Sequence, residues 1–148
     1  MRKILYEDMV KIIARHAQYL AGNAGGEKAE LAEVDFYGTD YSNVNLSGAN
    51  LQRTSFKRAN IMGINLEGAD LKDANMKRAC FAGANLKNSN LEGTFLKGCN
   101  FMDADLRGAN LKGASLEDAI FDDAKYDDRT VWPDGFDPVT AGAILVKE

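Results

Sequence analysis

Residues 104–118 read ADLRGANLKGASLED, which is three consecutive units of five residues with leucine at each centre. The same unit extends in both directions without insertion, from Ala29 to Asp128. All 20 central residues are large and apolar or aromatic, and alanine occupies 12 of the 20 positions two residues before them. Asn or Asp usually precedes the centre, and glycine often lies two residues after it. The repeating unit is therefore Ala-(Asn/Asp)-Leu-X-X.

A period of five matches neither the 3.6-residue turn of a helix nor the two-residue alternation of a strand. It suits a short extended segment followed by a tight turn, and Gly and Asn tolerate the positive φ of such a turn. We expect the centre and the small residue two before it to point inward. The pattern resembles the pentapeptide-repeat family over 100 of the 148 residues. The resemblance implies an all-β fold, a right-handed quadrilateral β-helix of about five coils with four pentapeptides each.

The ends of such a solenoid need caps, because terminal coils expose core and unpaired backbone. We divide the chain into a capping helix and turn at 1–28, the repeats at 29–128, and a C-terminal cap and tail at 129–148. An amphipathic helix is predicted over 3–21, ended by the glycine-rich turn that follows. Its expected apolar face consists of Leu5, Met9, Ile12, Ile13, His16 and Leu20. His16 is interpreted as a packing residue.

At the other end, Val131 is expected to keep the five-residue register before the pattern breaks. Trp132 and Phe136 lie in a turn-rich segment and are predicted to cover the last coil. The apolar tail 141–146 either packs on the rod or joins a second subunit. A monomer and a weak homodimer through this tail therefore both stay open.

Folding the repeat at 20 residues assigns each centre to one of four faces. Phe81, Phe101 and Phe121 then stack as an aromatic ladder on the third face. Cys80 is expected to point outward and Cys99 inward, so their β-carbon vectors do not converge. Two free thiols are consistent with a reducing cytoplasm, which is the predicted location.

The second face concentrates positive charge on its outer side. Lys57, Lys77 and Lys97 form one column, and Arg58 and Arg78 stack beside it. These five cations are called the basic strip. Phe95 is predicted to be exposed next to them. Like charges about 5 Å apart repel by up to about 1 kcal/mol per pair in water before salt screening. The hypothesis is a docking strip for an acidic partner or a phosphate. The alternative is a solvated face whose side chains splay apart.

The outer side of the third face is apolar instead. Met62, Cys80, Ala82, Met102 and Ile120 form a stripe there, which is the alternative interface. Asp103, Asp122 and Asp123 have the oxygen ligands that calcium prefers, but no loop to wrap an ion is evident. No metal site is therefore predicted.

Several functional classes are disfavoured. The chain has no glycine-rich phosphate loop before a helix, nucleophile elbow or zinc-binding helix, so no enzyme and no cofactor are predicted. A net charge of −4 and a pI near 5.1 argue against direct nucleic-acid binding. No uncharged apolar run reaches membrane-spanning length, and Glu7, Asp8 and Lys11 interrupt any signal-peptide core.

The predicted function is a non-catalytic, rod-like interaction scaffold that binds a protein partner through one face. The family resemblance also implies an alternative, a DNA-mimicking modulator of DNA gyrase or topoisomerase. Such a mimic needs a long acidic surface in place of phosphates. Here the segment 115–138 carries net −6 while the rest of the chain carries +2, and the basic strip interrupts the middle.

Overall fold

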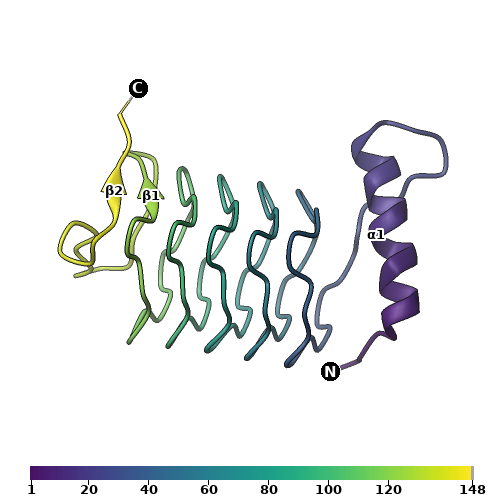
Figure 1. The fold of residues 1–148 in the computed structure, drawn as a ribbon, viewed down its shortest axis with the longest axis horizontal. Helices are drawn as coiled ribbons and strands as arrows, with labels where there is room; N and C mark the ends of the chain where they lie inside the picture. Colours follow the sequence, from purple (N-terminus) through teal and green to yellow (C-terminus); the bar gives the residue numbers. More distant parts are fainter. Residues whose placement is uncertain (148) are drawn as a thin grey trace.

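The computed structural model describes residues 1–147, which form one elongated stack of coils (Figure 1). Helix α1, Tyr6–Leu20, lies across the N-terminal end of the stack. Strands β1, Lys125–Tyr126, and β2, Ile144–Leu145, lie at the opposite end. Among these residues no helix combines the length and the apolar character needed to cross a bilayer.

Single parallel bridges join each coil to the next, and they recur every 20 residues. On the first face they link, in order, Glu30, Asn50, Asp70, Asn90 and Asn110. A tight turn recurs every five residues between them, so one coil contains four pentapeptides. Each side is too short for more than one bridge, which is why regular strand is confined to the two-residue elements β1 and β2.

Two positions of each pentapeptide shape its turn, one through its backbone conformation and the other through its side chain. The residue two after the centre has positive φ at every corner from Glu33 to Asp123. The frequent asparagine before the centre does not occupy that position. Its side chain accepts a hydrogen bond from the backbone N–H two residues later, as Asn85 does from Lys87 at 3.1 Å. Asn43 and Asn88 do adopt positive φ, as predicted for asparagine, but most asparagines lie before a centre and act as turn acceptors instead.

The core is made by the centres and the small residues two before them, as predicted. Phe81, Phe101 and Phe121 stack with 5.1 Å between successive ring centroids and with nearly parallel planes. Inward hydroxyls are satisfied locally, since Thr94 donates to the carbonyl three residues before it at 2.7 Å. Cys99 is buried, and burial raises the pKa of its thiol to about 12.

Helix α1 covers the first coil with fewer residues than expected. It begins at Tyr6 because Arg2 already pairs with Val34, so the chain enters the helix from the edge of the stack. Met9 is fully buried as predicted, but Leu5 is 65% exposed and Leu20 is 42% exposed. Leu5 has extended backbone at the N-cap, and the last turn projects beyond the part that the coil covers. The predicted apolar face was wrong for these two leucines.

His16 fixes the helix to the coil through both ring nitrogens. Its Nδ1 accepts the backbone N–H of Ala29 at 3.0 Å, and its Nε2 lies 2.7 Å from the carbonyl oxygen of Ser47. This pair of contacts requires the neutral ring with its proton on Nε2. The fully buried side chain is thus a packing residue, as predicted.

The C-terminal segment closes the opposite end. Trp132 and Phe136 lie 5.4 Å and 5.2 Å from Phe121 between ring centroids, so both cover the last aromatic of the ladder. The tail packs on the rod, because β2 pairs in parallel with β1. The register predicted for Val131 is wrong. Val131 bridges to Asn110, which is one residue beyond the 20-residue spacing, and it is 45% exposed.

Candidate functional site

The structure gathers the five cations of the basic strip around one shallow surface groove. Lys57, Lys77 and Lys97 follow buried centres of the second face, and Arg58 and Arg78 occupy the adjoining corner. Together these five side chains line a groove of about 250 Å³. The buried centres fix the columns, so the cations lie at successive coils as the repeat predicts.

The two arginines of the strip occupy a backbone conformation that favours glycine. Arg58 and Arg78 have φ of 58° and 59°, and Gly38 and Gly98 occupy the equivalent corners of other coils. A non-glycine residue there costs on the order of 1 kcal/mol. The chain therefore places guanidinium groups at this corner against a local backbone preference.

Phe95 joins the strip through Lys77. Its ring is 45% exposed, and the Lys77 ammonium lies 5.6 Å from the ring centroid. This separation is within the range of a cation–π contact. The predicted neighbourhood of Phe95 and the cations is thus present, with an exposed aromatic surface on one flank of the lysine column.

Counter-charges around the strip are few. Lys97 lies 3.9 Å from Glu117, and both side chains are largely exposed. Such surface pairs contribute between about 0 and 1 kcal/mol. Within residues 1–147 no other carboxylate lies within ion-pair distance of the strip.

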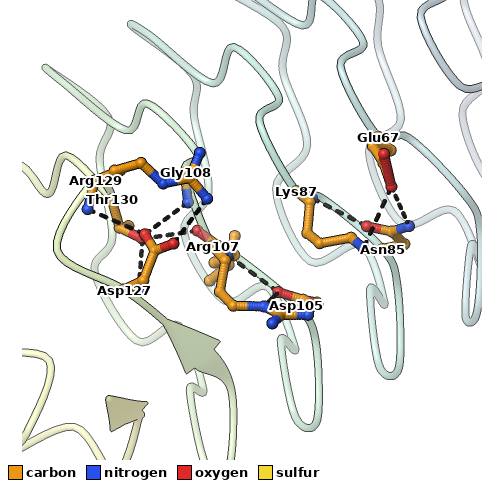
Figure 2. A network of polar contacts seen from close by, with 10 residues as sticks. Glu67, Asn85, Lys87, Asp105, Arg107, Gly108, Asp127, Arg129 and Thr130 are labelled. Atoms are coloured by element: carbon orange, nitrogen blue, oxygen red, sulfur yellow. Dashed lines mark hydrogen bonds and ion pairs between the residues drawn. The ribbon is translucent and has the colours of Figure 1, made fainter. Parts of the chain in front are cut away.

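The fourth face is the opposite case, because its Lys87 and Arg107 are paired (Figure 2). The ammonium of Lys87 lies 3.4 Å from Glu67, whose carboxylate also accepts a hydrogen bond from Asn85. Arg107 and Asp105 form a 2.7 Å ion pair. Burial opposes the ionisation of Asp105, but hydrogen bonds from Arg107 outweigh it and lower the pKa of that carboxyl.

Asp127 organises the end of the fourth face, where the register shifts. It accepts the Gly108 N–H at 3.0 Å and pairs with Arg129 at 2.8 Å. The Thr130 hydroxyl bridges Asp127 and the carbonyl of Leu106. Burial opposes the charge on Asp127, yet its bonds with Arg129 and Gly108 lower the pKa. Sequence reasoning missed this cluster, whose one available signal was the Asp-Asp-Arg-Thr turn across the end of the last repeat.

The third face keeps its apolar stripe. Met62, Met102 and Ile120 are each about two-fifths to one-half exposed, and Cys80 and Ala82 are partly exposed between them. No group of three ligand-type side chains suited to a metal gathers within residues 1–147. A hollow of about 520 Å³ at the C-terminal end, which the sequence did not predict, is lined by Asp127, Asp128, Arg129, Leu145, Val146 and Lys147.

A family model described as pentapeptide repeats matches in eight copies, over residues 29–68, 63–88 and 84–123. The chain belongs to the pentapeptide-repeat family. Among solved structures, a pentapeptide repeat protein from the Arabidopsis thaliana thylakoid lumen is 31% identical, with a TM-score of 0.52. That alignment covers 62% of this chain and 68% of the other.

Two cyanobacterial pentapeptide repeat proteins are also similar to this chain. Rfr23 from Cyanothece 51142 is 27% identical, with 84% of this chain and 99% of that one covered and a TM-score of 0.41. A protein from Nostoc PCC 7120 is 26% identical, with 98% of each chain covered and a TM-score of 0.36. No curated protein sequence matches this pentapeptide-repeat protein.

Proposed function

We propose that this pentapeptide-repeat protein is a non-catalytic interaction scaffold whose basic strip binds an acidic segment of a protein partner. The observation that supports this proposal is the groove lined by five cations. Among residues 1–147, only Lys97 of these cations lies within ion-pair distance of a carboxylate. The centres fill the interior of the rod, so its chemistry is presented on the outer faces.

Charge complementarity explains why the partner would be acidic. Stacked cations about 5 Å apart repel one another in water, and carboxylates of a partner would replace that repulsion by attraction. Arg58 and Arg78 can each hold a carboxylate through two parallel N–H donors. The exposed ring of Phe95 adds an apolar contact at the edge.

The finer predictions about the molecule belong to the same proposal. We infer a right-handed coil from membership of the family, and we keep the division at 1–28, 29–128 and 129–148. A cytoplasmic location and the absence of a cofactor also stay proposals. The stripe of Met62, Cys80, Ala82, Met102 and Ile120 is the second surface to test if the basic strip binds nothing.

Differential affinity capture tests the basic strip. The wild type is compared with a strip-reversed variant, Lys57→Glu, Lys77→Glu and Lys97→Glu. The matched control reverses Lys28, Lys72 and Lys112, which lie outside the strip and give the same net charge. Proteins that the wild type and the control retain, and the strip-reversed variant loses, support the proposal. Equal retention by all three contradicts it.

The gyrase alternative has a separate test. The exposed acidic side chains of this protein are most concentrated near the C-terminal end, as for Asp118, Asp122 and Asp128. A change in DNA supercoiling by the wild type that disappears when these aspartates become asparagines would favour the DNA mimic. The scaffold proposal expects no effect on supercoiling from either protein.

A further inference from the structure

The spacing of the lysines and the residues around the basic strip indicate what kind of acidic segment it binds. This inference rests on the proposed function. We infer that the segment it binds is an acidic amphipathic α-helix, lying along the rod with its carboxylates over the lysine column. The bound helix points its N-terminus toward Glu117 and Asp118. One apolar side chain of the helix packs on Phe95.

The axial spacing of the lysines matches a helix better than a strand. Successive coils are about 4.8 Å apart, so Lys57, Lys77 and Lys97 span about 10 Å. On a helix, residues i and i+7 are about 10.5 Å apart, with i+3 and i+4 between them on the same face. Three same-side residues of an extended strand span about 13 Å, so a strand would run out of step over the same three coils.

The strip and Phe95 together occupy three positions across the width of the face, of which the lysines and the arginines form columns. Phe95 precedes a centre, the lysines follow centres by one residue, and Arg58 and Arg78 follow by two. The order across the face is therefore aromatic, lysine, arginine. A helix offers three adjoining columns of side chains, with carboxylates over Lys and Arg and an apolar residue on the flank. A strand along the rod offers only one row to the same surface.

The two ends of the strip differ, which gives the bound helix a direction. Glu117 and Asp118 continue the lysine and arginine columns beyond Lys97, whereas Tyr37, 52% exposed, continues the lysine column at the other end. The N-terminus of a helix carries partial positive charge and its C-terminus partial negative charge. The favourable arrangement places the N-terminus at the two acids and the C-terminus toward Lys57.

Three synthetic peptides of identical composition test the inference. One places Glu at i, i+4 and i+7 with a Phe on the flank of that face, and the second scatters the same residues around the helix. The third keeps the first pattern but moves its proline from the end of the peptide to the centre, where proline breaks the helix. All three contain one proline, which is terminal in the first two. Fluorescence anisotropy gives the affinities, and circular dichroism reports helix formation on binding.

We expect the patterned peptide to bind the wild type at least about tenfold more tightly than the other two and to become helical. The strip-reversed variant should lose this binding, and the control reversed at Lys28, Lys72 and Lys112 should keep it. Phe95→Ala should weaken binding by about threefold to tenfold. A spin label at the peptide N-terminus should broaden the amide signals of Glu117 and Asp118.

The outcomes separate this inference from the proposed function. Equal, strip-dependent binding of all three peptides overturns the helix, while the acidic docking strip stands. Broadening at Tyr37 by the N-terminal label overturns the direction. Tighter strip-dependent binding of inorganic polyphosphate than of every peptide overturns the helical partner and assigns the strip to a phosphate polyanion. Absence of strip-dependent binding to any peptide overturns the inference, and loss of strip-dependent capture as well overturns the proposed function.

Discussion

The second and fourth faces have the same backbone but use charge in opposite ways. On the fourth face, Lys87 and Arg107 lie within 3.4 Å and 2.7 Å of carboxylates from their own face. On the second face, Lys57 and Lys77 occupy the equivalent positions and line a groove with other cations. The repeat sets where each side chain lies. The residues before and after each centre decide whether a face is internally paired or left open to a partner.

The largest expected effect concerns the core that both faces share. Phe101→Ala should lower the free energy of unfolding by about 3–5 kcal/mol, because it leaves a cavity between Phe81 and Phe121. Urea denaturation measures the change. Phe95→Ala is the matched control on the second face, and its exposed ring should contribute less than about 1 kcal/mol. Equal losses from the two changes would contradict the inside–outside assignment.

A smaller loss is expected from the paired face. Asp127→Ala removes the acceptor for Gly108 and Arg129 where the register shifts, and should cost about 1–2 kcal/mol. Thermal unfolding with the neighbouring Asp128→Ala as control measures it, since Asp128 has no hydrogen bond among the described residues. A loss no larger for Asp127→Ala than for Asp128→Ala would show that the carboxylate does not hold the turn.

The paired face should also produce a dependence on acid. The pKa values of Asp105 and Asp127 are lowered in the folded protein, so their contribution to stability is complete above the ordinary carboxyl range. It is lost as the pH falls from about 5 through the lowered folded values. The melting temperature should therefore fall in this window, and less steeply for the double variant Asp105→Asn, Asp127→Asn. An unchanged slope in that variant would assign the acid sensitivity to other groups.

The smallest effects compare the two faces directly. Lys57→Gln should raise the free energy of unfolding by up to about 0.5 kcal/mol at low salt, because it removes a like charge from the groove. Lys87→Gln should lower it by a similar amount, because it removes the pair with Glu67. Both differences should shrink as salt is added. The same sign for both substitutions would break the distinction between an open and a paired face.

Positions inside the repeat were predictable because the bridges recur at the same 20-residue interval. That regularity places Phe81 next to Phe101, and Lys57 next to Lys77, by counting alone. The position of Phe95 beside Lys77 follows from the same count. Core and candidate site could be predicted together, because on one coil the inward and outward residues alternate in a fixed order.

Features outside the repeat could not be found by counting. Val131 lies one residue out of register because the turn held by Asp127 and Thr130 accommodates an extra residue. Leu5 and Leu20 fit the apolar face of a helix, but the width of the first coil decides how much of α1 is covered. Side-chain pairing such as that of Asp127 with Arg129 likewise depends on a turn geometry that the period does not specify.

The 20-residue interval between bridges has a consequence for how genes for such proteins can change in length. Duplication of one pentapeptide would preserve the core pattern but rotate every later column by one face. A single duplication between Arg78 and Phe95 would thus separate Lys97 from Lys77, although the inward core pattern would be unchanged. Duplication of a full coil would keep all columns aligned and lengthen the rod. If the basic strip is under selection, homologues should differ in this region by multiples of 20 residues.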